Sequence, residues 1–208
     1  EKRANTANTA TQTPIAFGTQ FDTNWQKAVL RSAAFQTDNV LSASGSLGKS
    51  NYYTSFGYTS QEGVTIPNAM QRFSGRANVD HQAFDWLKIG TNLSFTKTHY
   101  DGLNTGTSSL SGNIFNAIRQ LPNTPIYNAA HPTGYNIDFI DPRVVGRWDN
   151  LLLAGDNITN IMYTLDKNKY GSDINRFIGS AFAEVRLFPF LNYKLQASVD
   201  QSQTKGYV

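Results

Sequence analysis

The sequence lacks cysteine and contains no long apolar run. Without cysteine the chain can form no disulfide, thiolate zinc site or cysteine nucleophile. No stretch approaches the roughly 18 consecutive apolar residues of a transmembrane helix, which excludes a helical membrane protein. Basic residues never form a run of five or more, and the net charge is only +3. The sequence therefore carries no footprint of nucleic-acid binding.

Residues with catalytic or metal-binding potential are also sparse. The three histidines, His81, His99 and His131, lie in different segments without the i, i+4 spacing of a zinc site. The sequence has no G-x-S-x-G nucleophile motif and no phosphate-binding glycine pattern. Acidic residues between positions 101 and 156 are interpreted as solvated loop residues rather than as a calcium site. We therefore expect no enzyme activity, no cofactor and no metal.

The sequence is instead rich in aromatic side chains, although its mean hydropathy is low. It has 13 Phe, 10 Tyr and 3 Trp, and the mean hydropathy is −0.41. A low mean is compatible with a membrane β-barrel, because only alternate residues of its strands face lipid. The aromatic residues fit either the ordinary preference of strands or an interfacial girdle. Four of them lie near the ends of expected strands: Tyr52, Trp86, Tyr100 and Tyr193.

Alternation of apolar and polar residues predicts about six strands. It is clearest in residues 71–81, where Phe73 and Val79 share one face and charged or polar residues occupy the other. Residues 87–98 repeat the pattern, and the short connection 82–86 makes the pair a hairpin. The other expected strands are 41–47, 51–61, 175–188 and 193–199, with a turn at 188–190 joining the last two.

The spacing of the strands predicts four segments. The short connections at 82–86 and 188–191 contrast with one very long connection, 101–174. Outer-membrane barrels show the same asymmetry, because their periplasmic turns are short and their extracellular loops are long. Short helices are expected within 23–36 and at 113–120. The segments are an irregular stretch and helix entering the barrel (1–36), barrel strands (37–100), a long extracellular loop region (101–174) and a barrel hairpin (175–208).

The predicted strands favour a membrane location. The clearest of them are long, near 10–13 residues, whereas soluble strands average about 5–6 and a tilted membrane strand needs about 9–11. No charged residue falls on the apolar faces of 73–79 or 87–95, as the cost of a charge in lipid requires. These features predict an all-β chain, an antiparallel transmembrane β-barrel segment. The alternative is a soluble all-β binding or adhesion module whose apolar face forms a core.

A series of sequence blocks occurs in a specific order and spacing. Residues 23–33 read TNWQKAVLRSA, and residues 72–80 read RFSGRANVD. Together with the other blocks they resemble the region after the N-terminal plug in SusC/RagA-type TonB-dependent transporters. The resemblance is strong over residues 23–128 and loose over 170–200. The other blocks are residues 39–45, 52–58, 61–63, 85–94 and, more weakly, 121–128 and 175–200.

The resemblance implies an outer-membrane protein that imports oligosaccharides, peptides or other large nutrients. It also implies two partners. One is a SusD-like surface lipoprotein that covers the barrel, and the other is the TonB complex, which acts through an N-terminal region that this sequence lacks. We expect the chain to be a fragment, because six strands cannot close the barrel of about 22 strands that such transporters form.

Two sets of side chains are candidates for contact with substrate. Arg72, Arg76, Asp80 and Lys88 lie on the polar faces of the expected strands and would line the barrel lumen. They could contact substrate or plug, or pair with one another across neighbouring strands. In the loop region, aromatic and arginine side chains are good contact residues for a sugar or peptide. The candidates there are Arg119, Tyr127, Tyr135 and Trp148, with packing between loops as the alternative.

Overall fold

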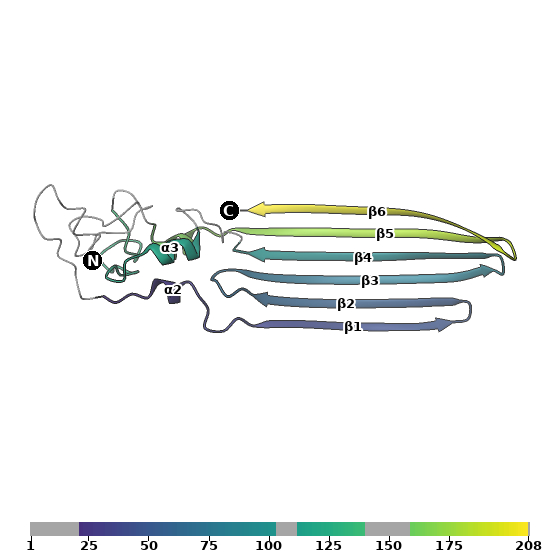
Figure 1. The fold of residues 1–208 in the computed structure, drawn as a ribbon, viewed down its shortest axis with the longest axis horizontal. Helices are drawn as coiled ribbons and strands as arrows, with labels where there is room; N and C mark the ends of the chain where they lie inside the picture. The colour runs from purple at the N-terminus through teal and green to yellow at the C-terminus, as the bar shows by residue number, and fades with distance from the viewer. Residues whose placement is uncertain (1–20, 103–111, 140–158, 208) are drawn as a thin grey trace, which may run out of the picture. The chain divides into compact units, whose positions relative to one another are not determined.

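The computed structural model describes residues 21–102, 112–139 and 159–207. These residues form two compact units (Figure 1). The sheet unit is a six-stranded sheet built from residues 34–62, 68–101 and 171–207. The helical unit combines the remaining described residues, which are 21–33, 63–67, 102, 112–139 and 159–170.

The sheet contains six antiparallel strands paired in chain order, from β1 at one edge to β6 at the other (Figure 1). The prediction of about six antiparallel strands is therefore confirmed. The strands are 12–18 residues long, which exceeds the 10–13 residues expected from alternation. Because β1 and β6 do not pair with each other, the sheet is open. The strands are β1 (Gln36–Leu47), β2 (Ser50–Glu62), β3 (Ala69–Phe84), β4 (Leu87–Asp101), β5 (Gly171–Phe188) and β6 (Leu191–Tyr207).

Three short turns lie at one end of the sheet and join β1 to β2, β3 to β4 and β5 to β6 (Figure 1). The first contains Gly48 with φ +58°, a conformation that costs a residue with a side chain about 1–2 kcal/mol. The second turn consists of Asp85 and Trp86, and the third of Pro189 and Phe190. All three hairpins are therefore tight at the same end.

A β-bulge precedes each of the last two turns. The register shifts between Gln82 and Phe84 in β3 and between Arg186 and Phe188 in β5. Alternation in the sequence ended the first of these strands at residue 81, but pairing continues to Phe84, which lies opposite Leu87. A bulge inserts one extra residue into one strand, so it interrupts the period of two that marks a strand in the sequence.

The strand register collects most apolar residues of the six strands on one face. Ala77 lies opposite Thr54 on β2 and opposite Leu93 on β4. Successive residues of a strand point to opposite faces, so the next residues, including Arg76 and Ser94, share the other face. We call these two surfaces the apolar face and the polar face.

The helical unit is built around a small core. Its helices are α2 (Trp25–Ala28), α3 (Asn113–Arg119) and α4 (Ile161–Lys167). Among the described residues, none of the helices has both the length and the apolar character needed to cross a bilayer. The prediction of a helix near residues 113–120 is confirmed, whereas α4 gave no periodic signal in the sequence. The core consists of Trp25, Val29, Ala117, Ile161 and Leu165.

Trp25 connects the beginning of the described chain to the loop that follows α3. Its indole Nε1 donates hydrogen bonds to the carbonyl oxygens of Leu121 at 3.2 Å and Thr124 at 3.1 Å. The expected helix over 23–36 is much shorter than predicted, because α2 ends at Ala28 and Leu30 pairs with Thr65 in an isolated bridge. The segment therefore packs as part of the helical unit.

Four asparagines are fully buried in the helical unit: Asn113, Asn116, Asn136 and Asn160. Their amides donate hydrogen bonds to main-chain carbonyls of this unit. Asn160 Nδ2 donates to the carbonyl oxygens of Ile126 at 2.8 Å and Asn136 at 3.0 Å, and Asn136 Nδ2 donates to Pro125 at 3.0 Å. Buried backbone groups need such partners, so asparagine side chains hold this irregular chain together.

Candidate functional site

The polar face brings together all four residues predicted to line a lumen. Arg72, Arg76 and Asp80 project from β3, and Lys88 lies on the same face of β4. Asp80 and Lys88 lie near the turns, and Arg72 lies toward the opposite end of the strands. The four charges are thus spread along the polar face and do not form one compact site.

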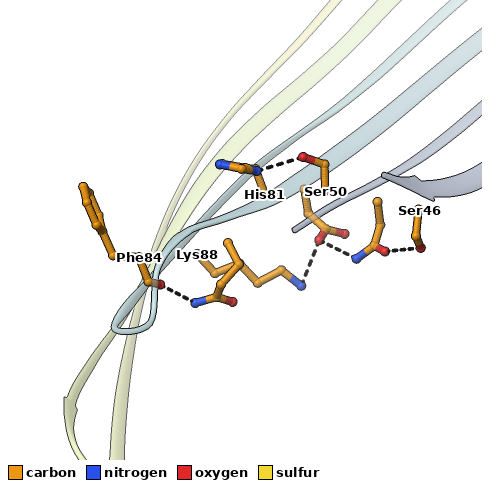
Figure 2. Close-up of polar contacts among 8 residues, drawn as sticks. Ser46, Ser50, His81, Phe84 and Lys88 are labelled. Atoms are coloured by element: carbon orange, nitrogen blue, oxygen red, sulfur yellow. Dashed lines mark hydrogen bonds and ion pairs between the residues drawn. The ribbon is translucent and has the colours of Figure 1, made fainter. Parts of the chain in front are cut away.

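A chain of polar contacts crosses four strands near the turns (Figure 2). Ser46 bonds Asn51 at 2.6 Å, and Asn51 Nδ2 donates to Asp80 Oδ1 at 3.0 Å. Lys88 Nζ lies 3.2 Å from the same carboxylate oxygen. Asp80 and Lys88 therefore satisfy each other across neighbouring strands and tie β1 to β4.

Cross-strand contacts also engage other charges of this face. Arg72 donates to Thr59 Oγ1 at 3.2 Å, and that hydroxyl donates to Asp38 at 2.8 Å. A pair that the sequence did not reveal joins β5 to β6, where Arg176 binds both carboxylate oxygens of Asp200 at 3.0 and 2.5 Å. The two partners lie far apart in the sequence, and only the strand register brings them together.

Arg76 differs from its neighbours on the polar face. It lies opposite Ser55 on β2 and Ser94 on β4 and is exposed. Within the described ranges, no hydrogen bond or ion pair engages its guanidinium. Arginine offers five donors in a planar fork suited to carboxylates and phosphates. Of the four predicted residues, Arg76 is the one best placed to bind a ligand from this face.

Three tyrosines form a cluster in the helical unit. Tyr127 and Tyr135 face each other across an isolated bridge with ring centroids 5.3 Å apart, and the Tyr163 ring packs edge-on against Tyr135 at 5.5 Å. Burial raises the pKa of Tyr135, and the neighbouring carboxylate of Asp166 raises it further. Tyr127, by contrast, is 60% exposed. The cluster thus offers one accessible aromatic ring, that of Tyr127, which packs against Tyr135, and Tyr135 in turn packs against Tyr163.

The other loop candidates have different surroundings. The Arg119 guanidinium stacks 5.1 Å from the ring centroid of Phe115 on its own helix. Trp148 lies outside the described residues. The structure therefore brings Tyr127 and Tyr135 together, as neighbours in a candidate contact surface. Sequence reasoning missed Tyr163, because nothing in its local pattern indicates a ring packed against residue 135.

The apolar face of the sheet unit is exposed. Leu41 on β1 is 76% exposed, and Leu195 on β6 is 61% exposed. Soluble proteins rarely expose a contiguous apolar surface of this extent, and such surfaces mark contact with membrane or protein. From residue 87 to residue 95 of β4, every side chain on this face is uncharged. The sheet therefore combines an apolar face, uncharged along this stretch of β4, with a charged polar face.

Comparison with known proteins identifies the type of sheet. The chain is 32% identical over 112 residues to "TonB-dependent receptor P3" of Formosa agariphila, a match covering 52% of the chain and 11% of that receptor. It is 24% identical over 207 residues to "TonB-dependent receptor SusC" of Bacteroides thetaiotaomicron, covering 93% of the chain and 19% of that receptor. No family model matches the chain. The chain thus spans about a fifth or less of the length of these relatives.

Solved structures show the same fold. The RagAB peptide importer in its "open-open" state matches with a TM-score of 0.67 at 24% identity, over 93% of this chain and 20% of the importer chain. A structure of the RagAB peptide transporter matches over 99% of this chain and 22% of its own, with a TM-score of 0.64. The six antiparallel strands therefore correspond to a stretch of barrel wall. The resemblance drawn from the sequence blocks is confirmed: the chain is similar to a segment of SusC/RagA-like TonB-dependent transporters.

Proposed function

We propose that the protein containing this chain imports large nutrients, oligosaccharides or peptides, across the outer membrane in a TonB-dependent manner. The observation that carries the proposal is the sheet with an exposed apolar face, which is uncharged from Leu87 to Phe95, and a charged polar face. In a membrane barrel the first meets lipid and the second lines the lumen. The names of the relatives, a TonB-dependent receptor and a peptide importer, support the same activity.

The proposed arrangement assigns a side of the membrane to each end of the sheet. Residues 37–100 and 175–208 form barrel wall, residues 1–36 lead into it, and residues 101–174 lie outside the cell. The tight turns fit the periplasmic side, because periplasmic turns of such barrels are short. The opposite ends of the strands then face the extracellular side.

The proposal includes two partners. A SusD-like surface lipoprotein covers the barrel, which is supported by the resemblance to SusC and by the two-component name of the RagAB importer. The TonB complex supplies energy through a region outside these 208 residues. Neither partner requires catalytic chemistry from this chain, in agreement with the absence of an enzyme motif from the sequence.

Substrate contacts are proposed on two surfaces. In the barrel wall, Arg76 faces the lumen with its guanidinium unengaged, whereas Arg72, Asp80 and Lys88 serve mainly to tie strands together. In the helical unit, Tyr127 presents an exposed ring that could stack on a sugar or a peptide side chain. Tyr135 supports this ring. Arg119 and Trp148 complete the proposed loop contacts.

Uptake by intact cells tests the function. The host strain lacking the gene is complemented with the complete protein and given a fluorescent tryptic digest of casein or a fluorescent plant-polysaccharide hydrolysate. We expect uptake of one probe that disappears when a protonophore collapses the proton gradient. Tyr127→Ala should reduce uptake at low probe concentration, while Tyr193→Ala, a similarly exposed tyrosine on the apolar face, should not. Equal uptake by complemented and deleted strains with both probes would contradict the proposal.

A further inference from the structure

The uncharged part of the apolar face is shorter than the strands that carry it. On β4 it extends from Leu87 to Phe95, although the strand continues to Asp101. On β5 it extends from Phe177 to Leu187 within an 18-residue strand. These stretches are 9 and 11 residues long by position, and a tilted membrane strand needs about 9–11. The sheet therefore carries a band of bilayer height with strand projecting beyond it.

Stacked aromatic pairs mark the band at the turns. Each bulge shifts the register so that Phe84 lies opposite Leu87 and Phe188 lies opposite Leu191, both apolar-face residues. Phe84 stacks on Trp86 at 5.5 Å, and Phe188 stacks on Phe190 at 5.6 Å. Figure 2 shows the Phe84 ring turned away from the polar contacts around Lys88. Aromatic rings favour the boundary between hydrocarbon and water, so this edge of the band is an interface.

Charged residues mark the other edge, on the same face. Directly beyond Phe95 comes Lys97, which lies opposite Phe73. The next residue on this face is His99, which bonds Asp173 at 2.7 Å and lies 3.3 Å from Asp101. On this face of β4, an aromatic residue, Phe95, is therefore followed directly by a charged one, Lys97.

Two lysines flank this histidine cluster. Lys97 lines a depression of about 230 Å³ together with Gln71, Phe73, His99 and Asp173. Lys205 lies opposite Asp173 on β6. Neither ammonium group forms an ion pair within the described part of the chain, because the neighbouring carboxylates, Asp101 and Asp173, pair with His99.

We propose that Lys97 and Lys205 bind the headgroup phosphates of outer-leaflet lipids, with the acyl chains covering the band from Phe95 to Leu87. This inference rests on the proposed outer-membrane location and adds to it the position of the bilayer and its polar contact. A lysine at the edge of hydrocarbon lays its apolar stem on the band and extends its charge into the headgroup layer. The part of β4 beyond residue 97, including His99 and its partners, then lies outside the hydrocarbon layer.

Site-specific quenching in the complete protein tests both parts. Single cysteines at Leu93, Asn175 and Ser94 carry a bimane fluorophore in phosphatidylcholine vesicles, with Asn175 chosen because it lies opposite Lys97. Acyl-chain nitroxides should quench the label at Leu93 more strongly than headgroup nitroxides, and the order should reverse at Asn175. Ser94 on the polar face should respond weakly to both quenchers.

The phosphate contact is measured by the enrichment of doxyl-labelled phosphatidic acid over doxyl-labelled phosphatidylcholine at the Asn175 label. The double variant Lys97→Gln, Lys205→Gln should lower that enrichment roughly 25-fold, because each lysine contributes about fivefold at an anionic surface. Lys194→Gln, on the polar face, is the matched control and should leave it unchanged.

The outcomes separate this inference from the proposed function. Unchanged enrichment in the double variant, or quenching at Asn175 that matches Leu93, would overturn the inference while leaving the barrel in the membrane. A Leu93 label that neither lipid quencher reaches would overturn both, because the apolar face would not meet lipid at all.

Discussion

The sheet unit and the helical unit follow opposite rules for their apolar side chains. In the helical unit, Trp25 and Ile161 are almost fully buried, and asparagine amides satisfy the main chain around them. In the sheet unit, Leu41 and Leu195 are mostly exposed, and strand pairing supplies the main-chain hydrogen bonds of the inner strands.

The difference indicates that the helical unit is adapted to water and the sheet unit to lipid. A small core surrounded by polar groups is the solution for a segment in water. A paired sheet with an apolar outer face is the solution for a segment in lipid, where every main-chain polar group must be bonded within the protein. One chain of 208 residues therefore contains parts adapted to both environments.

The largest expected effect is the loss of Trp25 from the core of the helical unit. Trp25→Ala should reduce the local stability of that unit by about 3–5 kcal/mol, because it leaves a cavity and removes the indole hydrogen bonds to the carbonyls of Leu121 and Thr124. Hydrogen exchange of the Thr164 and Asn168 amides, both bonded within α4, measures the loss in the complete protein. Trp86→Ala, at an exposed turn of the sheet, is the control and should leave these amides protected.

A charge on the apolar face should disturb the sheet unit almost as strongly. Leu93→Arg places a guanidinium in the middle of the apolar face and should cost about 2–4 kcal/mol in a bilayer. Ser94→Arg, one residue away on the polar face, should be tolerated. The fraction of folded protein is measured as the heat-modifiable band after refolding into lipid vesicles. Equal losses for the two variants would show that the faces do not differ in solvent.

Asn160 tests whether amide side chains hold the helical unit together. Asn160→Ala removes two buried hydrogen bonds and the contact of its side chain with Tyr163 at the start of α4. We expect a local destabilisation of about 1–3 kcal/mol, since the carbonyls of Ile126 and Asn136 each lose a hydrogen bond. Asn168→Ala, at an exposed position after α4, is the control. If hydrogen exchange in α4 were equal in both variants, amide bonding would not explain this unit.

The smallest effect is expected for the ion pair on the polar face. Lys88→Met removes the partner of Asp80, but both side chains are about one-third exposed and Asn51 still binds the carboxylate. The change should cost no more than about 1 kcal/mol, as for other exposed pairs. The midpoint of urea unfolding in lipid vesicles provides the measurement. A loss of stability as large as that of Leu93→Arg would mean that the polar face is also shielded from water.

The strands were predictable because their side chains alternate over long stretches. Phe73, Val79 and Leu93 were assigned to the correct face from the sequence alone. The strand ends were not predictable to the same degree. The bulges before Phe84 and Phe188 interrupt the period of two, and residues 99–101 pair although they no longer alternate apolar with polar.

The helical unit was mostly hidden from sequence analysis. Its buried asparagines are residues that usually mark loops, so their positions gave no sign of a folded core. Tyr127 and Tyr135 were recognised as contact candidates from their residue type, but their packing with Tyr163 depends on a turn that brings distant segments together. Arg76 was grouped with three other charged residues, and only the cross-strand contacts of those three distinguish it from them.

The most direct test of the central claim is the partitioning of the complete protein between outer-membrane and soluble fractions, read by gel mobility before and after heating. A membrane-embedded barrel predicts a band in the outer-membrane fraction that changes mobility on heating. A soluble protein whose mobility does not change would contradict the account. The apolar face around Phe73, Val79, Leu93 and Leu195 would then be the core of a soluble β module.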